Sequence, residues 1–159
     1  MKIGITSLVQ LSVYFDELDA GGVLYHASYI KLCDRARNIA LAEAGCPTQS
    51  LFDDNHALAV VRCDNIFRKP LRMQDCLVAS RLISWSKRSL AVRHAIFDTK
   101  ADPKAIIDAG LEIDSVPGCY FSAETTLVSV HVKEMTSTPL PKYLRHALGL
   151  PEQVNGECR

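Results

Sequence analysis

The sequence predicts an α+β fold in which an antiparallel β-sheet wraps around one long central helix. One stretch, residues 27–44, repeats apolar side chains at helical spacing and is long enough for a helix of about 27 Å. Five stretches rich in β-branched and aromatic residues surround it, one before the helix and four after it. Because the helix carries an apolar stripe that must be covered, the economical arrangement is a sheet curled around it.

The boundaries of the first elements follow from their turn residues. A first strand is expected over residues 8–15, and Asp19-Ala20-Gly21-Gly22 is a strong turn signal before the helix. The helix is expected to end at Gly45, since glycine tolerates a left-handed cap and the proline two residues later cannot continue the helix.

The later strands are expected over residues 56–68, 76–85, 89–98 and 120–132. The stretch 100–119 is an insertion loop, too long for a hairpin turn, with a helical fragment over 103–109. The tail, 134–159, is expected to be irregular because it contains three prolines, with a short helix over 142–148. We expect one domain over residues 1–159, with no internal repeat.

Composition excludes several classes of protein. Of 159 residues, 48% are hydrophobic and 23% charged, which is typical of a soluble globular domain and not of a disordered chain. Eighteen basic residues balance eighteen acidic ones, which argues against a general nucleic-acid-binding protein. The charges are segregated, however: residues 62–93 carry eight basic and two acidic side chains. This basic block is either an anion-binding surface or the solvated face of two strands.

The six cysteines and the N-terminus indicate the compartment. No two cysteines have C-x-x-C spacing and no Cys/His group has zinc-ligand spacing, so we expect reduced thiols and no metal. The first 15 residues do not read as a signal peptide, and no stretch approaches the length of a membrane span. The sequence predicts a soluble, cytoplasmic protein.

Asp19 is the first candidate for chemistry. It lies in a glycine-containing turn directly before the helix, where the backbone N–H groups of the first turn have no helical partners and the helix dipole is positive. A carbonyl oxygen placed there would be polarised beside a carboxylate, which is the arrangement that acyl transfer or hydrolysis requires. On spacing alone, an aspartate in such a segment is more often an ordinary turn residue.

The segment 13–37, VYFDELDAGGVLYHASYIKLCDRAR, closely resembles the signature of the hotdog-fold acyl-CoA thioesterases. Within them it is most similar to the 4-hydroxybenzoyl-CoA thioesterase group and the Tol–Pal-associated thioesterases. The matching residues occur in the order Tyr14, Asp19, Gly22, Tyr25-His26, Tyr29 and Ala36-Arg37. The resemblance covers residues 8–99 well and the strand 120–132 more loosely, and the insertion at 100–119 departs from it.

The resemblance implies roles for these residues. Asp19 matches the family's catalytic carboxylate, acting either as nucleophile or as general base, and His26 matches the position whose backbone N–H faces the thioester oxygen. The His26 ring is a candidate for proton transfer, or else caps or packs at the helix start. Gly22 belongs to the substrate-binding turn, and Tyr25 and Tyr29 are expected to line the acyl pocket or a subunit contact.

The resemblance also gives the basic block a role, because coenzyme A carries phosphates that Arg and Lys bind well. Arg68, with its neighbour Lys69, and the hairpin residues Lys87, Arg88 and Ser89 are therefore candidate substrate-binding residues. The implied partner is an acyl-CoA substrate bound by a homodimer or homotetramer. No cofactor is expected, since CoA is part of the substrate.

Two other functions stay open. A hotdog dehydratase acting on hydroxyacyl thioesters is one, although its catalytic pair is placed differently from the Asp19 motif. A non-catalytic acyl-CoA-binding hotdog protein is the other, although such a binder would not need Asp19 and its glycine turn. The acyl group is left open between aromatic, naphthoyl and short-chain forms.

Overall fold

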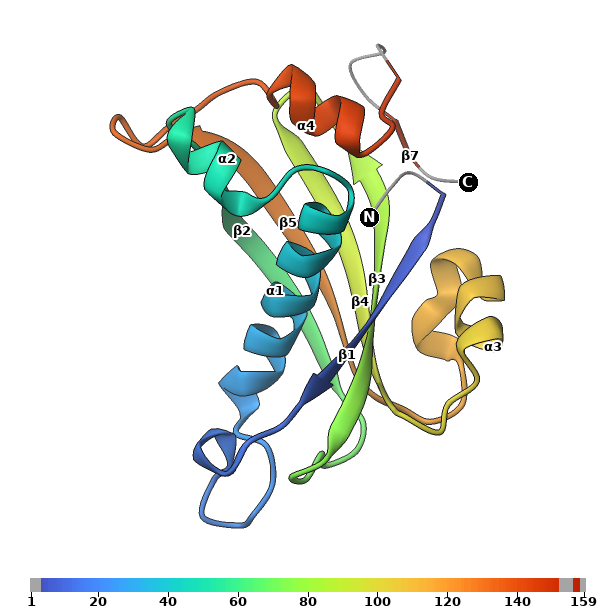
Figure 1. The fold of residues 1–159 in the computed structure, drawn as a ribbon. Coiled ribbons are helices and arrows are strands. Elements are labelled where there is room, and N and C mark those ends of the chain that lie inside the picture. The colour runs from blue at the N-terminus through green and yellow to red at the C-terminus, as the bar shows by residue number, and fades with distance from the viewer. Residues whose placement is uncertain (1–3, 152–155, 158–159) are drawn as a thin grey trace.

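The computed structural model describes residues 4–151 and 156–157. One antiparallel sheet curls around the helix α1 (His26–Glu43), which confirms the expected arrangement (Figure 1). The strand order is β1-β3-β4-β5-β2, with β6 added beside β5 and β7 beside β3. The strands are β1 (Thr6–Ser12), β2 (His56–Phe67), β3 (Asp75–Trp85), β4 (Ser89–Asp98), β5 (Cys119–His131), β6 (Thr136–Ser137) and β7 (Gly156–Glu157).

The first strand ends earlier than expected. β1 stops at Ser12, and Phe15 begins a short 3-10 helix, η1 (Phe15–Glu17), where the sequence predicted strand. The Glu17 carboxylate accepts a hydrogen bond from the backbone N–H of Tyr14 at 3.0 Å, which turns the chain out of the sheet.

A short helix, α2 (Thr48–Asp53), follows α1 and was not predicted, because six residues carry too little periodicity to be recognised.

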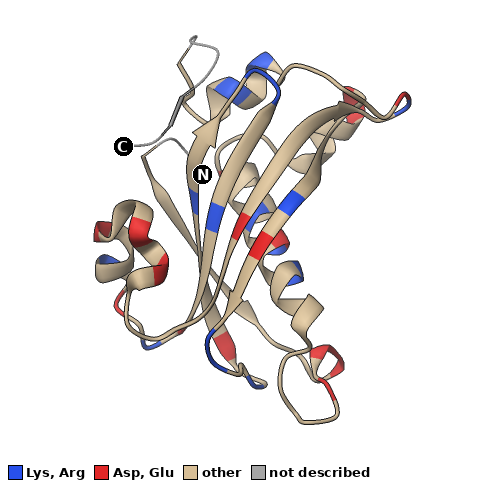
Figure 2. Ribbon diagram, turned by 180° about the vertical axis from the view of Figure 1, so that it is seen from behind, with Lys and Arg blue, Asp and Glu red and all other residues tan. Residues whose placement is uncertain are grey.

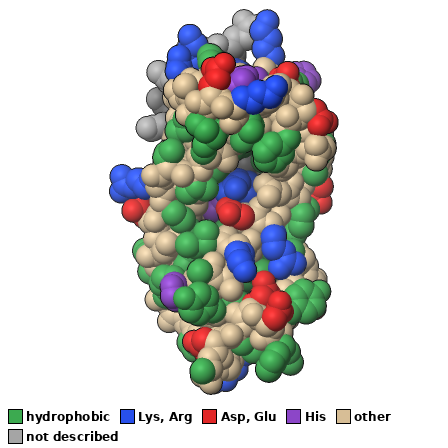
Figure 3. All heavy atoms as spheres, turned by 90° about the vertical axis from the view of Figure 1, so that its left-hand side faces the viewer, with side chains coloured by type: hydrophobic (Ala, Val, Ile, Leu, Met, Phe, Trp, Pro, Cys, Tyr) green, Lys and Arg blue, Asp and Glu red, His purple; other side chains and the backbone are tan. Residues whose placement is uncertain are grey.

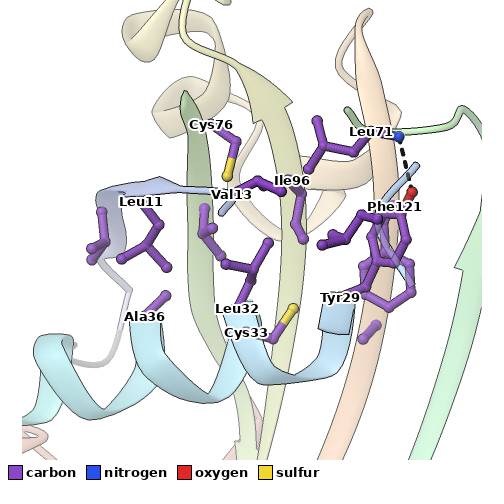
Figure 4. Close-up of a cluster of buried hydrophobic side chains, with 14 residues drawn as sticks. Leu11, Val13, Tyr29, Leu32, Cys33, Ala36, Leu71, Cys76, Ile96 and Phe121 are labelled. Atoms are coloured by element: carbon purple, nitrogen blue, oxygen red, sulfur yellow. Dashed lines mark hydrogen bonds between the residues drawn. The ribbon is translucent and has the colours of Figure 1, made fainter. Parts of the chain in front are cut away.

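The main core lies between α1 and the inner face of the sheet. Leu32, Cys33 and Ala36 on α1 are buried against residues of β1, β3, β4 and β5, and Figure 4 shows these side chains pointing toward one another. Ile39, expected on the apolar stripe, is 38% exposed instead. The small side chains of Ala36 and Ala40 allow the helix to approach the strands closely.

A polar pair is buried within this interface. His94 on β4 lies opposite Ser80 on β3, with 2.9 Å between the ring Nδ1 and the hydroxyl, and both side chains are fully buried. Burial, with a smaller effect of the nearby Arg37 guanidinium, lowers the pKa of His94 to about 3. His94 is therefore a neutral ring at physiological pH.

The insertion is an ordered layer on the outer face of the sheet rather than a loop. It forms α3 (Pro103–Asp108), close to the expected fragment, and the 3-10 segment η2 (Gly110–Ser115). Asp102 caps α3 by accepting from the Lys104 N–H at 2.9 Å. Ile106 and Ile113 are fully buried against the outward-facing side chains of the sheet. Figure 2 shows this layer beside rows of charged residues on the strands.

The tail is also more regular than expected. It crosses the β3–β4 turn, where the Leu140 N–H donates to the Lys87 carbonyl at 2.9 Å, and then forms α4 (Lys142–Ala147). Leu144 and Leu148 are fully buried in a second core cluster at this end of the sheet. This agrees with the short helix expected over 142–148. Cys158, the last of the six cysteines, lies outside the described residues.

The described cysteines are free thiols, and four of the five are buried. Burial raises the pKa of the Cys76 thiol to about 12, so this side chain behaves as a small hydrophobe. None of the helices within the described residues is both long and apolar enough to span a membrane.

The strand β2 is one of the two edge strands of the sheet, with β1 at the other edge. It pairs only with β5. Because α1 leans over β1 and β3 and α2 packs near the start of β2, the second half of β2 is left largely exposed. Val60, Val61 and Ile66 are each about half exposed on this strand. Figure 3 looks at this side of the molecule, where hydrophobic side chains run along its length and charged ones gather in the middle.

Candidate active site

The Asp19 loop is held in a defined shape between η1 and α1. The Asp19 N–H donates to the Val23 carbonyl at 2.8 Å, and the carboxylate oxygen Oδ1 accepts from the N–H groups of Gly21 at 2.8 Å and Val23 at 3.3 Å. Gly22 has φ +72°, a left-handed conformation that glycine adopts without strain. One carboxylate oxygen is thus bound by the loop, and among the described residues no donor bonds the other, Oδ2.

The loop is attached to the helix as well as to itself. Glu17 accepts the Tyr25 N–H on its backbone carbonyl at 3.0 Å, and its carboxylate lies 3.6 Å from the Arg35 guanidinium on α1. Leu18 and Leu24 form a single β-bridge across the base of the loop. These contacts hold Asp19 at a constant position relative to the start of α1.

The helix start supplies free backbone donors. His26 is the first residue of α1, and no carbonyl or side chain in the described part of the chain accepts its backbone N–H. Its exposed ring packs on Tyr25, with 4.2 Å between ring centroids. His26 lines the cavity described below, and its unpaired N–H lies at the positive end of an 18-residue helix.

Asp19, Tyr25, His26 and Tyr29 line one cavity of about 400 Å³. Tyr29 is buried, and its phenolic oxygen accepts the backbone N–H of Leu71 at 3.0 Å, the bond dashed in Figure 4. Its ring meets Phe67 edge-on, with centroids 5.4 Å apart. The cavity lining thus combines an aromatic pair with the carboxylate and the helix start. Gly22 lies outside it, on an adjoining hollow that also contains Asp19.

Arg68 lines the same cavity, but its guanidinium is already engaged. It donates to the Ser122 hydroxyl at 2.7 Å and to the Asp114 carboxylate of the insertion at 3.0 Å. The backbone N–H groups of Arg68 and Lys69 both donate to the Tyr120 carbonyl. The insertion therefore braces this wall of the cavity, and the charge of Arg68 is balanced by Asp114.

The other basic candidates lie far from Asp19 in the chain. Lys87, Arg88 and Ser89 form the β3–β4 turn, at the opposite end of β3 from the Asp19 loop (Figure 1). Arg88 donates to the carbonyl and the hydroxyl of Ser137, each at 2.8 Å, and the Ser89 hydroxyl pairs with that of Ser86 at 2.6 Å. A single chain does not bring this turn to the cavity, so its substrate role stays a prediction.

Sequence reasoning missed part of the cavity wall. The lining residues that were not predicted are Val23, Leu24, Phe67 and Pro70. In the segment 67–70, the sequence had indicated only Arg68 and Lys69, because of their charge. Phe67 ends β2 directly before these two residues, and that proximity was the available signal. Among the described residues, no group of three or more His, Cys, Asp or Glu side chains is arranged to hold a metal ion.

The arrangement suits attack on a polarised carbonyl. Asp19, with one unbonded carboxylate oxygen, and His26, with an unpaired backbone N–H, line the same cavity, so the site holds both a candidate base or nucleophile and a candidate donor to a carbonyl oxygen. The pattern of the thioesterase-like superfamily matches residues 13–148, from the end of β1 through α4. The chain belongs to the thioesterase-like superfamily.

Curated relatives of this thioesterase-like chain carry thioesterase names. It is 38% identical over 106 residues to the acyl-CoA thioesterase YbgC of Haemophilus influenzae, covering 62% of this chain and 78% of the relative. It is 32% identical to the acyl-CoA thioester hydrolase YbgC of Escherichia coli over 55% of this chain, and the match spans 66% of that relative. A Microcystis aeruginosa 1,4-dihydroxy-2-naphthoyl-CoA hydrolase is 27% identical over 86% of this chain and 88% of its own.

Solved structures confirm the hotdog fold expected of this thioesterase-like chain. The Synechocystis protein Slr0204, a 1,4-dihydroxy-2-naphthoyl-CoA thioesterase, superposes with a TM-score of 0.72 at 19% identity, covering 91% of this chain and 96% of that one. The gentisyl-coenzyme A thioesterase BH1999 superposes with a TM-score of 0.72 at 20% identity, and the match covers 89% of this chain and 99% of that one.

Proposed function

We propose that this protein hydrolyses an acyl-CoA thioester to a free acid and coenzyme A. The observation that carries the proposal is the shared cavity of Asp19 and the unpaired His26 N–H at the start of α1. The thioesterase names of the curated relatives support the same reaction.

The proposed chemistry divides between the two groups. The His26 N–H hydrogen-bonds the thioester oxygen and stabilises the negative charge that develops there, an effect of about 3 kcal/mol for one good donor. Asp19 acts through Oδ2, either by removing a proton from a water that attacks the carbonyl carbon, or by attacking that carbon itself to form an anhydride that water then opens. In both routes the C–S bond breaks, the CoA thiolate leaves and takes a proton, and the acyl carbon gains a hydroxyl oxygen.

We propose an aromatic acyl group as the preferred substrate. The cavity is lined by Tyr29 and Phe67, whose rings already meet edge-on, and by Tyr25. A flat ring completes such a cluster with favourable edge and face contacts. The relatives named as dihydroxynaphthoyl-CoA hydrolases act on an acyl group of this kind.

We also propose that the working unit is at least a homodimer formed through β2. This strand lies at an edge of the sheet and exposes Val60 and Phe67, and Phe67 also lines the cavity. An exposed apolar edge strand is unstable unless it is paired or covered. A symmetric pair of β2 edges would extend the sheet across both subunits and close the open side of the cavity.

The decisive experiment compares Asp19→Asn with the wild type on a panel of aromatic and short-chain acyl-CoAs, with release of the thiol as readout. The asparagine amide oxygen can accept the same two loop N–H bonds, so the loop should keep its shape. We expect kcat/KM to fall about 100-fold or more, because the carboxylate is lost. Asp16→Asn, an exposed neighbour outside the cavity, should leave kcat/KM unchanged.

Two results would contradict the proposal: no turnover of any thioester by the wild type, or an undiminished Asp19→Asn variant. Binding of acyl-CoA without turnover by the wild type would favour a non-catalytic binding protein instead.

The assembly is tested by light scattering after size-exclusion chromatography. Val60→Lys should shift the protein toward a monomer, whereas Ile107→Lys, an equally exposed apolar residue on α3, should not. A wild-type monomer at high concentration would contradict the dimer.

A further inference from the structure

The strand β2 has one edge that no other strand of the described chain pairs with. Its other edge pairs with β5, and β2 is the last strand in the order of the sheet. The exposed half of β2 has the sequence Val-Val-Arg-Cys-Asp-Asn-Ile-Phe over residues 60–67. Two apolar residues stand at each end of this segment, and a base and an acid flank the cysteine in the middle. A second copy that runs in the opposite direction presents the same order of apolar and charged residues, with acid and base exchanged.

The charged centre of the segment is exposed. Arg62 and Asp64 point to the same face of the sheet, where the Arg62 Nε lies 2.6 Å from the Asp64 carboxylate, and both side chains are more than half exposed. On the β5 side, Asp64 lies directly opposite Glu124, a residue of the same charge. Like charges directly opposite each other destabilise a sheet. An arginine on the free side of Asp64 would offset that repulsion.

The two ends of the segment are apolar and exposed as well. Val60 is 46% and Val61 61% exposed at one end, and Ile66 is 54% and Phe67 52% exposed at the other. Apolar side chains on an open edge strand favour pairing with another strand. Because the charged centre lies midway between the two apolar ends, one antiparallel alignment of two copies brings together both kinds of residue at once.

We propose that a second copy of this chain pairs with β2 in a single register, with the two-fold axis at Cys63. Residues directly opposite in an antiparallel pair point to the same face, so the axis passes through a residue and not between two. An axis at Arg62 places two guanidinium groups opposite each other, and an axis at Asp64 places two carboxylates opposite each other. With the axis at Cys63, Arg62 lies opposite the partner subunit's Asp64. This inference rests on the proposed dimer and specifies how its two edges align.

The register also determines what covers the Asp19 cavity. Phe67 lines that cavity, and its half-exposed side chain comes to lie beside the partner subunit's Val60 and Val61. The partner thereby adds an aliphatic surface next to the ring pair of Tyr29 and Phe67. By symmetry, each cavity of the dimer is completed by the other subunit in the same way.

The first test exchanges the charges in the full chain and measures dimer dissociation by sedimentation over a dilution series. Arg62→Asp and Asp64→Arg, taken singly, each place like charges opposite one another twice, so we expect each to raise the dissociation constant about tenfold. The double variant Arg62→Asp/Asp64→Arg restores opposite charges and should return the dissociation constant to that of the wild type. Lys100→Asp, the same change of charge at an exposed position outside β2, should leave it unchanged.

This pattern distinguishes the register from a purely intrachain ion pair. An ion pair within one chain contributes equally to monomer and dimer, so its loss leaves the dissociation constant unchanged.

The second test uses the thiol on the proposed axis. Two residues directly opposite on antiparallel strands have Cα atoms about 4.5–5.5 Å apart, which is within the range that a disulfide spans. Mild copper-catalysed oxidation by dissolved oxygen, which takes two protons and two electrons from the two Cys63 thiols, should therefore link the subunits. Cys63→Ser should stay a dimer but lose the link on a non-reducing gel. Cys158→Ser, which removes the cysteine outside the described residues, should retain it.

A wild-type dimer that Cys63 does not link, or a double charge variant that dissociates as readily as the single variants, would overturn the register and leave the dimer itself intact. A monomeric wild type would overturn both. Neither measurement needs turnover, so failure of the thioesterase proposal would appear only in the thiol-release assay.

Discussion

The phenolic oxygen of Tyr29 on α1 accepts a hydrogen bond from the backbone N–H of Leu71 at 3.0 Å, and this bond joins the central helix to the segment that forms the cavity wall. Leu71 is fully buried, and its carbonyl accepts the Leu24 N–H at 2.7 Å. One residue thus connects the helix, the end of the Asp19 loop and the wall at residues 67–70.

Removal of that phenolic oxygen should destabilise the protein. Tyr29→Phe leaves the buried Leu71 N–H without a partner, so we expect the free energy of unfolding to fall by about 1–3 kcal/mol. The control is Tyr143→Phe, whose side chain is partly exposed and whose hydroxyl makes only a long bond of 3.5 Å to the Ser50 carbonyl, so its loss should cost less, about 0.5 kcal/mol. Urea unfolding of both variants measures the difference, and equal losses would refute the structural role of the Tyr29 bond.

The left-handed backbone of Gly22 predicts a cost that depends on conformation alone. A β-carbon there would approach nothing closer than 4.0 Å, the flexible Arg72 guanidinium, so Gly22→Ala introduces no clash. The φ of +72° should still cost about 1–2 kcal/mol for alanine. Gly22→Asn should cost less, because asparagine tolerates this region. Thermal unfolding should show that stability decreases from the wild type to Gly22→Asn and then to Gly22→Ala. An alanine variant as stable as the wild type would contradict the prediction.

Buried His94 predicts a specific dependence of stability on pH. Its pKa is lowered to about 3 in the folded protein, whereas an unfolded histidine titrates near 6.5, so below pH 6.5 the unfolded state binds the additional proton. Neutral His94 therefore contributes fully to the free energy of unfolding above pH 6.5. That contribution is lost as the pH falls toward 3, by about 1.4 kcal/mol per pH unit.

The measurement is the free energy of unfolding at pH 7 and pH 5 for the wild type and His94→Gln. The wild type should lose more stability than the variant between these pH values. His146→Gln, which replaces an exposed histidine, should retain the wild-type slope. Parallel slopes for the wild type and His94→Gln would show that His94 does not titrate as the structure implies.

The packing of the insertion predicts that two adjacent isoleucines contribute very differently to the free energy of unfolding. Ile106 is fully buried between α3 and the outer face of the sheet, whereas Ile107 is 47% exposed. Ile106→Ala should cost about 2–5 kcal/mol through the cavity it leaves, and Ile107→Ala should cost less than about 0.5 kcal/mol. Similar unfolding free energies for the two variants would mean that the insertion is not packed on the sheet.

Local sequence signals were sufficient for most of the architecture. The helix begins at His26, one residue from its expected start, and ends at Glu43, because its apolar spacing and the glycine after it are local properties. The strand Ser89–Asp98 was predicted to the residue from its alternation. The Asp19 loop could be predicted for the same reason, since its turn and the helix that follows are contiguous in the chain.

The errors lie where contacts distant in the sequence decide the outcome. Ile39 has the hydrophobicity of a core residue, yet the way α1 leans over β1 and β3 leaves it exposed. The polarity of the insertion suggested a loop, but Ile106 and Ile113 are buried against the sheet and Asp114 pairs with Arg68. β1 ends early where the Tyr14 N–H donates a hydrogen bond to the Glu17 carboxylate.

The sequence by itself determined the elements, the fold class and the pairing of Asp19 with a helix start, because each depends on residues only a few positions apart. The tertiary structure decided which basic side chains are paired with a carboxylate and which are not. Arg68 is neutralised by Asp114, 46 residues away, while Lys87 at the far end of β3 has no carboxylate partner within residues 4–151. A guanidinium or ammonium group interacts with whatever the strand order places beside it, and that neighbour cannot be read from the residues on either side of it in the chain.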